Sequence, residues 1–224
     1  MCGRYSLNAT LQAIYEILKI KTMLNLQPRY NIAPGQPILA VRLDGKGERE
    51  LTHLRWGLVP SWMKELPTAT TMINARMETV AEKPSFKGAY KYRRCLIPAS
   101  GFYEWKVVGG PKQPYNIRPQ DQPLFAFAGL WEHWQSPDGS ELETAAILTG
   151  EASASIKDIH HRMPVILKPK DHEAWLKDEK GVTDVFQPDM AFDAYPVSRL
   201  VNNVANDDET LLQEARVPEQ KTLI

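Results

Sequence analysis

Residues 94–130 read RCLIPASGFYEWKVVGGPKQPYNIRPQDQPLFAFAGL, and this stretch decides the fold. It consists of short runs of apolar, β-branched and aromatic residues. Glycine and proline interrupt them, most clearly at Gly109-Gly110-Pro111. Runs of this length and composition are typical of strands rather than helices. The sequence therefore predicts strands at Arg94–Pro98, Phe102–Val107, Tyr115–Arg118 and Leu124–Leu130.

The same strand pattern continues on both sides of this stretch. Ile38–Leu43 and Arg49–Arg55, joined by Asp44-Gly45-Lys46-Gly47, are typical of a hairpin with a glycine turn. Further strands are expected at Thr144–Thr149 and Pro164–Leu167. Strands outnumber helices and do not alternate with them, which predicts an α+β class. We expect a single domain with a curved, mostly antiparallel sheet flanked by short helices.

Helices are expected to be few and short. Asn8 is predicted to cap the first of them, whose apolar stripe is Leu11, Ile14, Tyr15 and Leu18. The others are predicted at 85–92, 153–159, 171–177 and 208–215. Residues 205–224 match no motif and are expected to form a terminal helix or a tail.

Composition limits the class of protein. Lys+Arg and Asp+Glu both count 27, so any contact with nucleic acid must come from a local cluster of cations. Cys2 and Cys95 make no disulfide framework, which favours a reducing, cytoplasmic setting. No apolar run approaches the roughly 20 residues of a membrane helix. The histidines follow no zinc-binding spacing, and we expect no metal, no cofactor and no membrane contact.

The N-terminus, Met1-Cys2-Gly3-Arg4-Tyr5, carries the first chemical signal. Initiator methionine is normally removed before a small residue such as cysteine. Cys2 would then carry a free α-amine beside its thiol, with ordinary pKa values of about 8 and about 8.5, so that both are partly deprotonated near neutral pH. The amine can condense with an aldehyde, and the thiol can then close a five-membered thiazolidine. The alternative is an incidental cysteine at a frayed terminus.

Three further clusters could carry chemistry, and each has a structural alternative. In Ile73–Thr79, Asn74 can orient a carbonyl and Arg76 can pair with a phosphate, or both can be ordinary turn and surface residues. In Pro98–Trp105, alternation places Glu104 on the face of Phe102, where an apolar setting would raise its pKa. Otherwise it is an edge-strand glutamate facing solvent.

The third cluster is Asp158–Pro164. His160 or His161 could shuttle a proton, and Arg162 could pair with a phosphate. The alternative is a pair of surface histidines that end a helix.

Taken in order, these motifs resemble the SOS-response-associated peptidase (SRAP) family, from residue 1 to about residue 203. The motifs are Met1-Cys2-Gly3-Arg4-Tyr5, Tyr30-Asn31-Ile32-Ala33-Pro34, Trp56-Gly57-Leu58-Val59-Pro60, Asn74-Ala75-Arg76, Gly101-Phe102-Tyr103-Glu104-Trp105, Ile159-His160-His161-Arg162-Met163-Pro164 and Pro196-Val197-Ser198 with Val201-Asn202. The resemblance implies a barrel-like sheet and a groove for single-stranded DNA or its junction with duplex. It also implies an abasic-site sensor of the DNA-damage response that crosslinks through its N-terminal cysteine. The family name records a proposed autoproteolysis that would expose the same aminothiol.

The resemblance also implies roles for individual residues. Cys2 is similar to the nucleophile, Asn74 to the residue that holds the Cys2 acyl group, and Glu104 and His160 to the acid–base pair. The phosphate contacts are expected from Arg4, Arg76 and Arg162, and base stacking from Trp62, with Trp105 a second candidate that core packing explains as well.

Two other functions stay open at this point. One is an N-terminal cysteine peptidase or amidohydrolase, with His160 or Glu104 as its base. A lyase reaction that proceeds through the Schiff base alone, without the thiol, is a further route for the same N-terminus. The other is a non-catalytic reader of modified bases in duplex DNA. For the leading function we expect a monomer that binds single-stranded DNA containing abasic sites.

Overall fold

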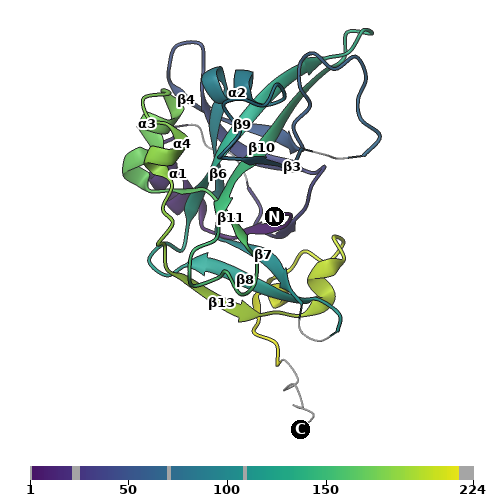
Figure 1. The fold of residues 1–224 in the computed structure, drawn as a ribbon, viewed down its shortest axis with the longest axis vertical. Helices are drawn as coiled ribbons and strands as arrows, with labels where there is room; N and C mark the ends of the chain where they lie inside the picture. The colour runs from purple at the N-terminus through teal and green to yellow at the C-terminus, as the bar shows by residue number, and fades with distance from the viewer. Residues whose placement is uncertain (1, 22–25, 70–71, 108–109, 217–224) are drawn as a thin grey trace.

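The structure is a computed structural model that describes residues 2–21, 26–69, 72–107 and 110–216. Five strands close a barrel: β3 (Pro37–Leu43), β4 (Arg49–Trp56), β6 (Arg94–Ala99), β9 (Phe125–Gln135) and β10 (Glu141–Glu151). All neighbours in the ring are antiparallel except β10 and β4, which pair in parallel. The long β9–β10 hairpin rises to the top of the molecule (Figure 1).

Short strands extend the barrel wall around the end of β10. β5 (Asn74–Arg76) pairs in parallel with β10, and β11 (Arg162–Pro164) pairs antiparallel with the end of the same strand. β12 (Ile166–Leu167) adds to β9. Strand β10 therefore lies between the strand that carries Asn74 and the strand that begins at Arg162.

A second sheet lies below the barrel (Figure 1). Its strands are antiparallel and follow the order β13 (Phe192–Pro196), β8 (Gln113–Pro119), β7 (Gly101–Lys106), β1 (Tyr5–Leu7) and β2 (Arg29–Ile32). Only Ser100 separates β6 of the barrel from β7 of this sheet. Buried rings join the two: the Phe127 ring of the barrel lies edge-on to Tyr5 at 5.7 Å and to Phe102 at 6.3 Å.

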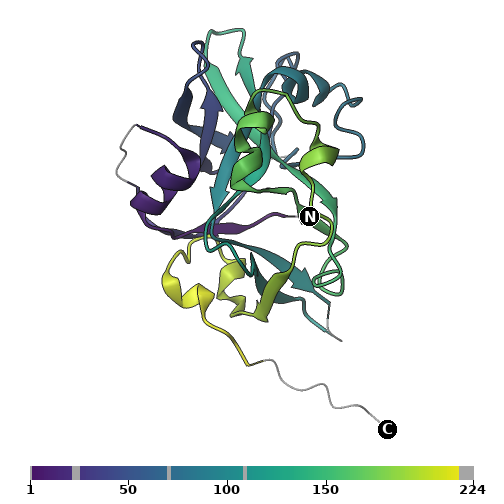
Figure 2. The same ribbon diagram turned by 90° about the vertical axis from the view of Figure 1, so that its left-hand side faces the viewer.

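Helices are short and peripheral, as α1 (Leu11–Leu18), α2 (Lys87–Tyr92), α3 (His172–Leu176) and α4 (Val182–Val185) show (Figures 1 and 2). The cap predicted at Asn8 is wrong. Thr10 is the N-cap, because its side chain accepts from the backbone N–H of Ala13 at 3.3 Å, while the Asn8 N–H binds Ser100 Oγ.

The helix predicted at 153–159 is also wrong. These residues form hydrogen-bonded turns, with the N–H groups of Ile156 and Lys157 donating to the Ser153 carbonyl. The hydroxyls of Ser153 and Ser155 bind each other at 2.8 Å, and serine favours turns and caps over helix interiors.

The predicted C-terminal helix at 208–215 is reduced to the 3-10 helix η3 (Glu209–Leu212), capped by Asp208. It ends because Glu214 bridges to Val197 and the Ala215 N–H donates to the Pro196 carbonyl. The remainder of the tail considered in the sequence, 217–224, lies outside the described residues. Figure 2 shows the segment after β13 lying against the lower sheet.

The predicted α+β class with a curved, mostly antiparallel sheet is confirmed. Within the described ranges, no helix has the length and apolar character that a membrane crossing requires.

Candidate active site

Cys2 and Asn74 meet at the junction of the barrel and the lower sheet. Cys2 is fully buried, three residues before β1, which packs against β6. The Asn74 side chain donates from Nδ2 to the Cys2 carbonyl at 2.8 Å. The pairing of Asn74 with Ile147 on β10 fixes the backbone position of Asn74 for this hydrogen bond. The contact expected between these two residues is present, and its chemical role stays a prediction.

Glu104 and His160 lie opposite each other beside this contact. Glu104 is 3% exposed on β7, so the alternative of a glutamate facing solvent is wrong. Desolvation by burial raises the pKa of Glu104 to about 7. His160 Nε2 lies 4.0 Å from Glu104 Oε2. Because its pKa is about 7, the Glu104 carboxyl is populated in both protonation states near neutral pH.

Several contacts fix the imidazole of His160. Its Nδ1 lies 3.0 Å from the backbone N and from the backbone O of Arg162, and its ring stacks on His161 with centroids 4.4 Å apart. Burial lowers the pKa of His160, which favours the neutral imidazole. The helix end expected at these histidines is absent, because they follow a turn and precede β11.

The thiol of Cys2 differs from the sequence-based expectation. Burial, and after it the nearby charge of Glu104, raise the pKa of Cys2 well above its ordinary value. The thiol is therefore protonated at neutral pH, and the expected partial ionisation is wrong for this environment. A group that accepts its proton must accompany any attack by sulfur.

A cavity of about 530 Å³ opens beside the acid–base pair. Trp105 forms part of its wall, held by a hydrogen bond from its indole N–H to Asn202 Oδ1 at 2.8 Å. The residues that line the cavity come from β7, the segment just before β8, the turn before β11 and the C-terminal segment: Glu104, Trp105, Pro111, Lys112, His160, Arg199 and Asn202.

Sequence reasoning missed Lys112, Arg199 and Asn202. Single cations in a chain with balanced charge form no pattern, and only the tertiary structure brings these positions to one cavity. Asn202 stood in the closing motif of the resemblance, which assigned it no contact with Trp105.

The residues predicted to contact DNA, three arginines for phosphates and Trp62 for base stacking, fall into two groups. Arg76 is exposed on β5, and Trp62 is 63% exposed, so both are free to meet a ligand. The Arg162 side chain is nearly buried and forms an ion pair with Glu78. Arg4 Nη1 donates to Asn31 Oδ1 at 2.8 Å and to the Val201 carbonyl at 2.6 Å.

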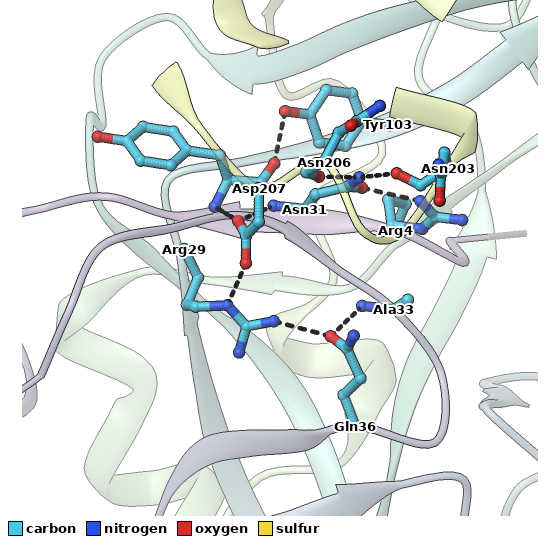
Figure 3. Close-up of polar contacts among 10 residues, drawn as sticks. Arg4, Arg29, Asn31, Ala33, Gln36, Tyr103, Asn203, Asn206 and Asp207 are labelled. Atoms are coloured by element: carbon cyan, nitrogen blue, oxygen red, sulfur yellow. Dashed lines mark hydrogen bonds and ion pairs between the residues drawn. The ribbon is translucent and has the colours of Figure 1, made fainter. Parts of the chain in front are cut away.

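Arg4 belongs to a polar network, the Asn31 network, that binds the segment Arg199–Asp207 to the lower sheet (Figure 3). Buried Asn31 donates from Nδ2 to the carbonyls of Val201, Asn203 and Asn206 at 2.6–3.2 Å. Asp207 accepts from the Arg29 side chain and from the N–H groups of Tyr30 and Asn31. This network holds the cavity wall that carries Arg199 and Asn202.

Comparison with known proteins places this chain in a family. The family model of the SOS response associated peptidase (SRAP) matches residues 1–204. The chain belongs to the SRAP family. It is 42% identical to the abasic site processing protein YoqW of Bacillus subtilis (strain 168), over 95% of this chain and 99% of that protein.

A more distant relative and a solved structure are also similar to this chain over most of its length. The chain is 33% identical to the abasic site processing protein YedK of Escherichia coli (strain K12), covering 95% of this chain and 99% of that protein. A crystal structure of a protein from Bacteroides thetaiotaomicron superimposes with a TM-score of 0.83 at 27% identity, over 96% of this chain and 100% of that one. The SRAP fold therefore spans the described elements from β1 to the C-terminal segment.

Proposed function

We propose that this SRAP protein processes abasic sites in single-stranded DNA by forming a covalent crosslink through Cys2. The observation that carries the proposal is the hydrogen bond from Asn74 to the Cys2 carbonyl, made beside the buried Glu104 carboxyl. It holds the front of the chain next to an acid–base pair. The names of the relatives, abasic site processing proteins, support the same substrate.

The reaction begins once Met1 is removed. The α-amine of Cys2 adds to the C1′ aldehyde of the opened abasic sugar, and loss of water gives an imine. The thiol then adds to the same carbon, forming the S–C bond, while its proton leaves sulfur and the imine nitrogen gains one. The product is a five-membered thiazolidine, and water is the only leaving molecule.

Glu104 and His160 divide the proton transfers. The abasic sugar is mostly a closed hemiacetal, so opening its ring needs an acid at the ring oxygen and a base at the hydroxyl. Glu104, with a pKa of about 7, can donate a proton in one step and accept one in another. The neutral His160 beside it acts as the base in ring opening. Glu104 is also the acceptor that the protonated thiol requires, since its charge already acts on Cys2.

The DNA strand crosses the cavity. Lys112, Arg199 and the exposed Arg76 supply positive charge for the phosphates, and Trp105 and Trp62 supply flat surfaces for bases. With balanced net charge, affinity for intact DNA is modest and salt-dependent, and the covalent bond provides persistence. The proposed partner is single-stranded DNA or its junction with duplex, bound by a monomer because one chain supplies the whole site.

A denaturing gel tests the proposal. Protein lacking Met1 is incubated with a single-stranded oligonucleotide carrying one abasic site, and a denaturation-resistant band is expected. Cys2→Ala should lose this band, whereas the matched variant Cys95→Ala, which alters the other buried cysteine, should keep it. A thiazolidine is ruled out if the Cys2→Ala protein still gives the full yield of the same product.

The two other functions predict different results. A cysteine hydrolase would turn over peptide or amide substrates added in trans, but the raised pKa of the Cys2 thiol does not favour it. A non-catalytic reader would bind modified duplex DNA and leave no covalent product.

A further inference from the structure

Arg162 has a side chain whose N–H groups divide between two partners. On the inner side, Nε and Nη2 lie 3.4 Å from Thr149 Oγ1, and Nη2 donates to the Thr149 carbonyl at 2.6 Å. On the outer side, Nη1 and Nη2 donate to the two carboxylate oxygens of Glu78 at 3.0 and 2.9 Å. The guanidinium is therefore fixed by strand β10 independently of Glu78.

Glu78 differs from Arg162 in its exposure. The Arg162 side chain is 11% exposed and that of Glu78 is 48% exposed, so the carboxylate covers the outer face of a nearly buried cation. Glu78 lies in a turn directly after β5, two residues beyond Arg76. Its side chain can swing into solvent without any change in the barrel.

The outer face of Arg162 has the shape of an anion site. Two parallel N–H donors match the two oxygens of a carboxylate and equally the two non-bridging oxygens of a phosphodiester. If Glu78 leaves, both donors are freed, while the Thr149 contacts keep the guanidinium in place. The backbone N–H of Arg162 also stays with His160 Nδ1, so the acid–base pair is not disturbed.

We propose that Glu78 is an internal phosphate mimic, which occupies the Arg162 subsite in the free protein and is displaced by a backbone phosphate of the bound strand. The proposal rests on the proposed function, because it needs a strand in the cavity. Exposed Arg76 beside the turn supplies a charge that guides the phosphate toward Glu78. The exchange sets the affinity for DNA, since each bound strand must first break an ion pair.

Glu78→Gln tests the exchange, with binding of an intact single-stranded oligonucleotide as the readout. Removing the competing charge should tighten the dissociation constant about fivefold at low ionic strength, and the gain should shrink as salt screens the contact. The matched control is Glu82→Gln, which removes the same charge from an exposed position of the same loop. It should change affinity less than about twofold.

A second variant shows whether the gain passes through Arg162. In an Arg162→Lys background, which keeps the charge and loses the paired donors, Glu78→Gln should give little or no gain. Unchanged or weaker binding by Glu78→Gln, or an equal gain from Glu82→Gln, would overturn the mimic while leaving the crosslink intact. Absence of DNA binding in every variant, together with no abasic crosslink, would overturn both proposals.

Discussion

The lower sheet carries two regions of buried polar groups, the Asn31 network and the candidate active site, and burial affects the polar groups of the two regions differently. In the Asn31 network, Asp207 accepts three hydrogen bonds and Asn31 binds three carbonyls, so polar groups are matched with partners. At the site, desolvation dominates the environment of Glu104 and raises its pKa to about 7. Polar groups that are hydrogen-bonded to one another hold the chain in place. A desolvated carboxyl has a raised pKa, so it can gain and lose a proton near neutral pH.

The comparison is tested most strongly at Glu104 itself. Glu104→Gln keeps the size of the side chain and removes the proton, so crosslinking to abasic DNA should slow by about a thousandfold. Single-turnover gel kinetics measure the rate, and thermal unfolding checks the fold. Glu214→Gln, at an exposed glutamate that bridges to Val197 and does not line the cavity, is the control. A rate within threefold of wild type would remove Glu104 from the chemistry.

The Asn31 network should instead respond in stability. Asn31→Ala leaves the carbonyls of Asn203 and Asn206 without the donor that Asn31 supplies and removes one acceptor of Arg4, which should cost about 3 kcal/mol of unfolding free energy. Urea unfolding measures the loss. Asn203→Ala, which removes an exposed amide and keeps the carbonyl, should cost less than about 1 kcal/mol. Equal losses in the two variants would contradict the network's role.

The pH dependence of stability sharpens the contrast. The Glu104 carboxyl titrates at about 7 in the folded protein and ordinarily at 4.5, so between these values the folded state binds more protons than the unfolded state. Its contribution to stability is therefore complete below pH 4.5 and is lost as the pH rises through 7. Between pH 5 and 8, wild type should lose about 2 kcal/mol relative to Glu104→Gln.

Urea titrations of both proteins across this range give the difference. Protein that retains Met1 is used, because the pKa of about 7 belongs to the chain with Met1 in place. Parallel pH curves for the two proteins would mean that Glu104 is not desolvated as the structure indicates.

The smallest effect is expected at Trp62. Its exposed ring contributes little to the core, so Trp62→Ala should leave unfolding unchanged and weaken binding of intact single-stranded DNA about fivefold. Fluorescence anisotropy with a labelled oligonucleotide measures the affinity. Tyr92→Ala, at an aromatic residue 70% exposed on α2, is the control and should leave affinity unchanged. Equal weakening by both variants would argue against a stacking role for Trp62.

Local pattern predicted most of the strands, because alternation and glycine or proline breaks are properties of neighbouring residues. It failed where a short segment had alternatives, as at 153–159, where serine hydroxyls bind each other, and at Asn8, where Thr10 is better placed to cap the helix. Alternation also placed Glu104 on the face of Phe102, but it could not show that this face is buried from solvent.

The sequence by itself determined the class of fold, the family resemblance and the residues with reactive groups, because each of these is read from residue types and their order. The tertiary structure decided their states. Packing of the barrel on the lower sheet buries Cys2 and Glu104. This burial keeps the thiol protonated and raises the pKa of the Glu104 carboxyl to about 7. Contacts between distant segments assign Arg4 to the Asn31 network and Arg162 to Glu78. Desolvation and long-range pairing depend on the whole fold, and no local pattern contains them.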